Sequence, residues 1–257
     1  MLAVLGVVVG LLVVGAAGLQ APSVRLAPML DTATSPPTTS PPTSPLSTSP
    51  PTTVPVVTTP RSRQHPSAPP RKERAQVTVP TTGQGGYRRA KTSVTASHTT
   101  GRLIRFDLRV ERGMPFDPED TARFVASVLN DDRSWTGSGR WRFQLVDDAD
   151  EAELHAWIVS RTTTNHKCFP LLTRGQVSCQ NGNNVVLNAT RWAHGAKAYG
   201  DDLLGYRTYL VNHEFGHYLG YGHVGCPAPG KRAPVMMQQT KGVGSCRSNP
   251  WPAPDRD

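Results

Sequence analysis

The most informative part of this chain is the stretch His213-Glu214-Phe215-Gly216-His217-Tyr218-Leu219-Gly220-Tyr221-Gly222-His223. Its spacing is H-E-x-x-H-x-x-G-x-x-H, which fixes three histidines, one glutamate and one glycine. In an α-helix, side chains four residues apart lie on one face, about 6 Å apart along the axis, so His213 and His217 can reach one ion. Three imidazoles and one open position are typical of a catalytic Zn²⁺ site. The stretch therefore predicts a helix that carries a zinc site.

The other fixed positions have separate roles in this prediction. Glu214 is rotated by about 100° from His213 around the helix, so it lies beside the ion and is the candidate general base for a water molecule. Gly220 stands where the helix should end, because glycine readily takes the positive φ that a sharp turn needs. That turn is expected to bring His223 back to the ion as the third ligand.

The motif resembles that of the metzincin metallopeptidases. This resemblance implies a zincin-like catalytic domain, with Zn²⁺ bound by His213, His217 and His223 and with Glu214 as the catalytic residue. It also implies a methionine in a tight turn beneath the metal.

A candidate for that methionine lies further along the chain, in the stretch Ala233-Pro234-Val235-Met236-Met237-Gln238. By the resemblance, the turn is assigned to Met236, with Met237 as the second choice. The alternative is that both methionines fill the core. The chain departs from better-known metzincins in two ways: no tyrosine follows at the place of their extra ligand, and residues 238–257 show no long helical pattern.

A second resemblance covers residues 77–252. This region, and above all residues 211–223 and 235–240 together with Cys226-Pro227, is similar to a family of uncharacterised exported actinobacterial proteins with zincin-like motifs. That resemblance implies no particular substrate.

The composition divides the chain into three parts: a signal peptide or transmembrane anchor over residues 1–20, a disordered stalk over residues 21–76, and a zinc metallopeptidase domain over residues 77–257. Residues 1–19 contain no charged side chain, and as a helix they would reach about 28 Å, close to the ~30 Å hydrocarbon core of a bilayer. Ala16-Ala17-Gly18 offers a cleavage site, so both a cleaved and a retained segment stay open. Either way, the domain is expected outside the cytoplasm, membrane-anchored or secreted.

The stalk is defined by its proline, serine and threonine content. Residues 31–60 contain nine prolines, fifteen serines or threonines and no aromatic residue. Such a segment has too little apolar area to offset backbone ordering, and it favours extended polyproline II. The basic residues that follow, Arg61 to Arg74, are read as a solvated linker end, with contact to anionic envelope polymer or lipid as the alternative.

Charge and motifs also limit the classes of partner that are expected. The net charge of +9 is spread along the chain, and no aromatic-interleaved basic patch or phosphate loop accompanies it, so no nucleic-acid partner is expected. The expected partners are a protein or peptide substrate in the cell envelope or outside the cell, and the membrane through the N-terminal helix. A monomer is expected.

All four cysteines fall in the predicted domain, and an even number in an exported chain suggests two disulfides. Three pairings are possible. The favoured one joins Cys168 to Cys179 and Cys226 to Cys246, because each bond then closes a local loop. A structural Cys₄ zinc site is the alternative, but its C-x₂-C pairs are missing.

Periodicity predicts one α+β domain. A half-buried strand is expected over residues 103–111, with Asp107 on its polar face, followed by a helix of about a dozen residues capped by Asp117. Strands are expected over residues 141–146, 154–160 and 185–188, and Asp202 should cap the helix that carries the zinc motif. This order favours a mixed sheet packed on two main helices, an irregular C-terminal part, and a cleft between the sheet edge and the metal.

Together these features predict an exported zinc-dependent endopeptidase that hydrolyses peptide bonds through a metal-activated water. One alternative is a zinc hydrolase that acts on peptide crosslinks of the cell wall. Another is a non-catalytic, zinc-stabilised adaptor of the cell envelope.

Overall fold

The computed structural model describes residues 77–252, so the predicted anchor and stalk, residues 1–76, lie outside the described residues. In the described part the chain is α+β, as predicted, with a six-stranded mixed sheet. The strands are β1 (Tyr87–Arg89), β2 (Arg102–Glu111), β3 (Trp141–Leu145), β4 (Leu154–Val159), β5 (Cys179–Asn181) and β6 (Asn184–Asn188). The helices are α1 (Pro118–Leu129), α2 (Arg161–Cys168), α3 (Ala189–His194) and α4 (Leu203–Tyr218), with short 3-10 helices η1 (Trp135–Ser138) and η2 (Lys197–Tyr199).

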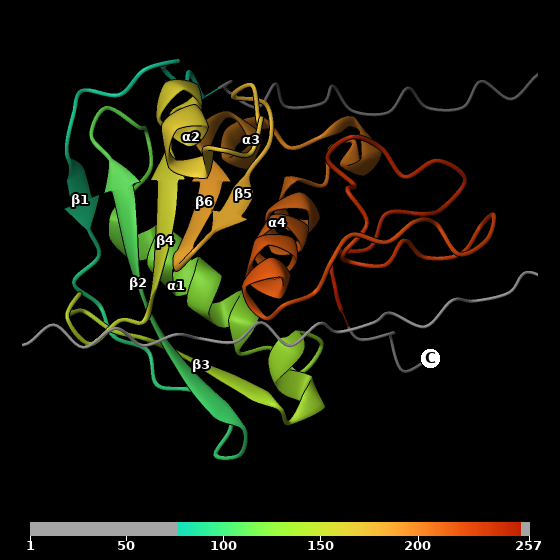
Figure 1. Cartoon of the computed structure of the whole chain (residues 1–257), viewed down its shortest axis with the longest axis horizontal. Helices are drawn as coiled ribbons and strands as arrows, with labels where there is room; N and C mark the ends of the chain where they lie inside the picture. Colours follow the sequence, from blue (N-terminus) through green and yellow to red (C-terminus); the bar gives the residue numbers. More distant parts are fainter. Residues whose placement is uncertain (1–76, 253–257) are drawn as a thin grey trace, which may run out of the picture. The chain divides into compact units, whose positions relative to one another are not determined.

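The sheet has the strand order β1-β2-β4-β6-β5, and β3 pairs with the first half of β2 (Figure 1). β2, β3, β4 and β6 pair in parallel, whereas β1 and β5 run antiparallel to their neighbours. β5 therefore forms one edge of the sheet, and Figure 1 shows this edge facing α4.

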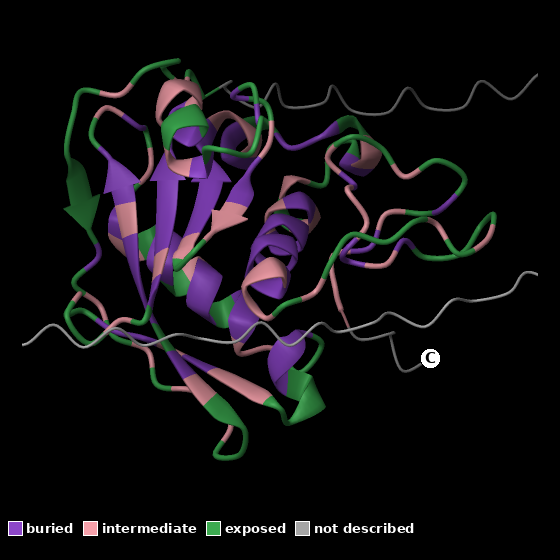
Figure 2. Cartoon of the chain, viewed as in Figure 1, coloured by how far each residue is buried: buried purple, intermediate pink, exposed green. Residues whose placement is uncertain are grey.

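One face of the sheet packs against α1 and α4, the two main helices that the sequence predicted. Phe215 of α4 lies edge-on against Phe106 of β2 and Phe143 of β3, with ring centroids 5.5 and 5.8 Å apart. All three rings are fully buried, and each such side chain contributes roughly 1.5–3 kcal/mol of transfer free energy. Buried residues accordingly follow β2, β4, β6 and α4 in Figure 2. Phe215 thus fixes the helix that carries the metal motif onto the sheet.

The opposite face of the sheet is covered too, which the sequence did not predict. Alternate residues of β4 belong to two apolar clusters: Ala156 and Ile158 to the main core, Trp157 and Val159 to a smaller one that includes Cys168 of α2. Helix α2 was missed because its sequence, RTTTNHKC, has no apolar period. Its N-cap is the hydroxyl of Ser160, which accepts from the Thr163 amide.

The prediction that Asp107 lies on the polar, exposed face of a half-buried strand was wrong. Its carboxylate is fully buried. Arg109 Nε donates to one carboxylate oxygen at 2.8 Å, and His155 Nδ1 lies 2.6 Å from the other. A buried carboxylate is retained only when such partners are present. The alternation in β2 therefore separates two covered faces.

Helix α1 begins and ends as predicted. Asp117 is the N-cap and accepts from the Asp120 amide at 2.9 Å, and Pro118 occupies the first turn. The helix has twelve residues, the length expected.

None of the helices in the described part of the chain combines the length and the apolar character that crossing a membrane requires.

Both predicted disulfides are present: Cys168–Cys179 and Cys226–Cys246. The second closes a loop in the irregular part after α4. Within the described residues of that part, the β-type backbone pairing is limited to the isolated bridge between Arg232 and Arg247. The irregular C-terminal part is therefore held by a covalent bond and by side-chain hydrogen bonds.

We expect the double variant Cys226→Ala/Cys246→Ala to lower the free energy of unfolding by about 3 kcal/mol. The bond joins residues 20 positions apart, and closing a loop of that length removes about this much entropy from the unfolded chain. Urea unfolding of the variant and the wild type measures the difference. A loss below about 0.5 kcal/mol would show that the loop is held by other contacts.

Candidate metal centre

Helix α4 positions the first two histidines of the motif. Asp202 caps its N-terminus by accepting from the Gly205 amide at 2.8 Å, as predicted. The helix ends at Tyr218, and Gly220 takes a φ of +92°, a conformation that glycine adopts without steric cost. The chain then turns back, and the Tyr221 amide donates to the Gly216 carbonyl at 3.0 Å. The predicted turn after the helix is confirmed.

Backbone carbonyls fix the orientation of two imidazole rings. Nδ1 of His213 lies 2.8 Å from the Val235 carbonyl oxygen, and Nδ1 of His217 lies 2.9 Å from the Tyr221 carbonyl oxygen. A carbonyl oxygen can only accept, so each Nδ1 carries the hydrogen. Each Nε2 therefore presents a lone pair, the tautomer that a metal ligand needs.

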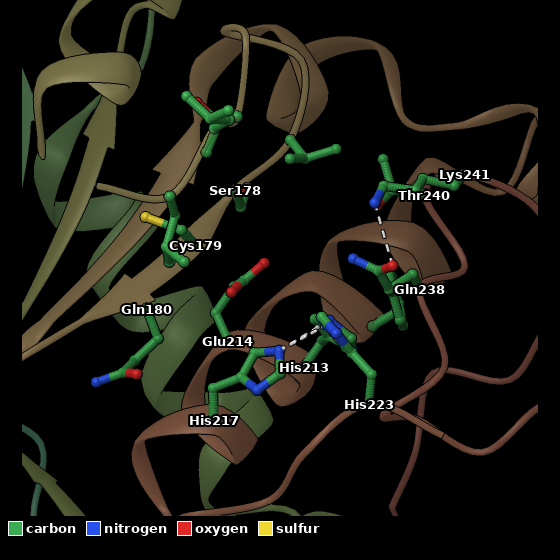
Figure 3. Close-up of a pocket in the computed structure, with 15 residues that line it drawn as sticks. Ser178, Cys179, Gln180, His213, Glu214, His217, His223, Gln238, Thr240 and Lys241 are labelled. Atoms are coloured by element: carbon green, nitrogen blue, oxygen red, sulfur yellow. Dashed lines mark hydrogen bonds between the residues drawn. The ribbon is translucent and has the colours of Figure 1, made fainter. Parts of the chain in front are cut away.

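The ring nitrogens of the three histidines gather at one place, and Figure 3 shows the His217 ring turned toward the other two. Nε2 of His217 lies 3.3 Å from Nε2 of His213 and 3.0 Å from Nε2 of His223. Two nitrogen ligands of a tetrahedral ion at 2.0–2.1 Å are separated by about 3.3 Å. The donor atoms offered by the three side chains all lie within 4.8 Å of one another. The structure thus brings the three predicted ligands together with the spacing of a single metal site.

Burial keeps these imidazoles neutral. It lowers the pKa of His213 to about 3, and it lowers the pKa values of His217 and His223 as well. The positive charge of Lys241 also contributes to the lowered pKa of His223. Neutral imidazole is the form that binds metal, so the site is ready for an ion at neutral pH.

Glu214 is the buried carboxylate of the site. Its side chain lies in the cleft beside the histidines in Figure 3, and the residue is 4% exposed. Burial raises its pKa to about 8. No residue between 77 and 252 forms a hydrogen bond or ion pair with its carboxylate. The carboxylate is therefore accessible from the cleft, where a water molecule or a ligand can pair with it.

Met236 lies directly beneath α4. The Met237 amide donates to the Pro234 carbonyl at 2.9 Å, which closes a turn around Met236. Met236 is 5% exposed and belongs to the main core, whereas Met237 is half-buried. A methyl group on Gly216 would come within 2.5 Å of the Met236 Sδ atom. Met236 thus lies in a turn that packs against Gly216 of the motif helix, and its role as the turn methionine of a metal site stays a prediction.

The segment after Met236 is anchored to α4 by residues that the sequence did not single out. The Tyr209 hydroxyl donates to the Met237 carbonyl at 3.1 Å and accepts from the Gln239 amide at 2.9 Å. The buried side chain of Gln239 donates to the carbonyls of Pro234 and Asn249. Isolated polar residues in an irregular segment form no pattern, so nothing in the sequence indicated this network.

We expect Gly216→Ala to lower the free energy of unfolding by about 1–2 kcal/mol. The added methyl would meet both the Met236 Sδ atom and, at 2.7 Å, the Cζ2 atom of Trp135. Overpacking of this kind costs about 1–3 kcal/mol, of which the better helix propensity of alanine offsets up to about 1 kcal/mol. Urea unfolding checks this. Gly222→Ala is the matched control, because a methyl there meets nothing within 4 Å, and equal stability of all three proteins would refute the close packing.

A cavity of about 430 Å³ opens in front of the three histidines. One wall is formed by the edge strand β5 and the loop before it, and the other by the segment after Met236, so the predicted cleft between sheet edge and metal site is present. The wall residues were not predicted, because no motif marks them. They include Leu171, Leu172, Ser178, Gln180, Gln238 and Lys241.

The sequence model of a family described as "Protein of unknown function (DUF3152)" matches residues 75–254, which include every residue of the candidate site. No curated protein and no solved structure matches the chain.

Proposed function

The chain belongs to the DUF3152 family of proteins of unknown function, and we propose that it is an exported zinc-dependent endopeptidase. The observation that carries the proposal is the convergence of three imidazole Nε2 atoms beside a buried carboxylate without a partner among the described residues. This combination supplies metal ligands and a proton acceptor in one cleft.

Zinc is the ion that best suits the donor set. Three neutral imidazole nitrogens are typical ligands of Zn²⁺, which keeps a further position open in catalytic sites, and the two separations from His217 Nε2 are close to tetrahedral spacing. Bound there by His213, His217 and His223, the ion would polarise a substrate carbonyl and lower the pKa of water.

Glu214 has the role of general base in this proposal. Burial raises its pKa in the metal-free site, and a nearby divalent cation lowers it again, so the carboxylate is ionised at neutral pH when the site is filled. It takes the proton of the attacking water and passes it to the leaving amine.

The remaining residues position these groups. The Val235 and Tyr221 carbonyls hold two ligand rings, and Met236 supports α4 from below. The two disulfides support export, since such bonds persist in oxidising compartments.

The test is digestion of a proteome-derived peptide library by the purified full-length chain, with sequencing of the new termini. We expect cleavage within peptides that stops when a chelator removes the metal and returns when zinc is added. Bound zinc without any cleavage would instead favour the zinc-stabilised adaptor. Cleavage confined to purified wall peptides would favour the hydrolase of cell-wall crosslinks.

We expect zinc to remain bound at pH 5.5, where free histidine, with a pKa near 6.5, is mostly protonated. Protons compete with zinc for imidazole, and the pKa of each ligand is lowered by burial, so this competition begins at lower pH than for exposed histidine. Zinc content after dialysis at pH 7 and pH 5.5 measures it. Loss of half the zinc between pH 7 and pH 5.5 would contradict the expectation.

A further inference from the structure

The cleft has an uneven charge distribution. Apart from the three histidines, the charged side chains among its lining residues are Glu214 and Lys241. Figure 3 shows them on opposite sides of the cleft. Glu214 lies next to the candidate ligands, so Lys241 is the cation available to a molecule that enters.

Lys241 has no carboxylate partner in the part of the chain between residues 77 and 252. Its Nζ atom donates to the Gln238 side-chain oxygen at 3.1 Å. An ammonium group has three donors, so two remain for a ligand. The residue is exposed, which leaves these donors accessible from the cleft.

The facing wall has an apolar part. Leu171 and Leu172 line the cleft and are 52% and 85% exposed. Their loop, between α2 and β5, is closed by the Cys168–Cys179 disulfide. It is also tied to α2 by Asn165, whose side-chain oxygen accepts from the Gly175 amide at 2.6 Å. The loop is thus fixed in place, and an apolar group that covers its exposed leucines would lower the free energy of the complex.

We propose that this cleft selects peptides in which a carboxylate contacts Lys241 while a bulky apolar side chain lies against Leu171 and Leu172. The inference rests on the proposed peptidase function and specifies its substrate class. A charged hydrogen bond gives orientation and the apolar contact gives affinity, the combination expected of a binding cleft.

The carboxylate has two sources, an aspartate or glutamate side chain or the C-terminus of the peptide. The test therefore uses peptide sets that carry Glu, Gln or Lys at one position and Leu or Ser at another, each with a free or an amidated C-terminus. We expect full-length wild type to cleave the acidic or free-acid members about 10-fold faster, the effect of roughly one charge-assisted contact. The arm that shows the preference identifies the source.

Two variants assign the preference to residues. Lys241→Glu is expected to reverse it, so that lysine replaces glutamate at the favoured position, and Leu172→Ser is expected to weaken the apolar preference alone. Lys91→Glu is the control for net charge, because Lys91 is exposed and lies outside the cleft. An active Lys241→Glu protein with the wild-type cleavage profile would overturn the proposal.

A binding measurement separates this inference from the proposed function. Zinc-loaded Glu214→Gln protein is titrated with fluorescent members of the same peptide sets. This measurement of binding does not require the protein to hydrolyse the peptides. We expect the acidic or free-acid members to bind about 10-fold more tightly, and we expect Lys241→Glu in that background to reverse the difference. Equal affinities would overturn the selection by Lys241 even if wild type cleaves peptides, whereas selective binding without cleavage would overturn only the peptidase function.

Discussion

Glu214→Gln is expected to lower kcat/KM for peptide hydrolysis by about 10³-fold, within the range that loss of a general base produces. Glutamine has nearly the same shape but cannot accept the proton of the attacking water. The zinc content and the affinity for peptides should stay at the wild-type level, because the ligands are His213, His217 and His223. Initial rates on one fluorogenic peptide, together with metal analysis of the same samples, measure both quantities.

Glu151→Gln is the matched control for the Glu214 experiment, since Glu151 is exposed and lies outside the cleft. It should keep full activity. Wild-type turnover by a zinc-loaded Glu214→Gln protein would remove Glu214 from the chemistry, and a loss of zinc would mean that its carboxylate helps to hold the ion.

His217→Ala is expected to weaken zinc binding by more than about 100-fold. Loss of a group that only orients a ligand costs about 10–100-fold, and here a ligand itself is removed. His217 is half-buried, so its truncation should disturb the core less than truncation of His213 would. Competition with a chelator of known zinc affinity gives the two dissociation constants.

Thermal unfolding provides an independent readout for this ligand variant. Free zinc at 100 times the wild-type dissociation constant should stabilise the wild type by about 2.7 kcal/mol and the variant by less than about 0.5 kcal/mol. His194→Ala is the control, because His194 is exposed and lies outside the cleft. Equal stabilisation of His217→Ala and wild type would place the ion elsewhere.

The elements with strong local signals were predictable. Asp117 with Pro118, and Asp202, mark helix starts because a side-chain oxygen satisfies free backbone amides, and both caps are present. Gly220 marks the end of α4 because the turn needs a positive φ. The spacing of the motif placed His213 and His217 on one helix face and His223 after the turn, and the structure brings the three side chains together.

Other features depend on tertiary contacts that leave no local pattern. Helix α2 is polar and is specified by its Ser160 cap and its disulfide more than by apolar periodicity. Asp107 alternates like a surface residue, but its partner His155 comes from a neighbouring strand. Lys241 and Leu172 line the same cleft but come from segments far apart in sequence, so neither could be assigned to the site before the fold was known.

The central claim is that three imidazoles from residues 213–223 hold one zinc ion while Glu214 faces the same cleft. X-ray absorption at the zinc edge of the purified full-length protein tests it most directly, with His217→Ala measured in parallel. We expect one zinc ion per chain, three imidazole nitrogens at about 2.0–2.1 Å and one further light-atom ligand, with one imidazole fewer or no zinc in the variant. A spectrum without imidazole ligands, or one identical in wild type and variant, would contradict it.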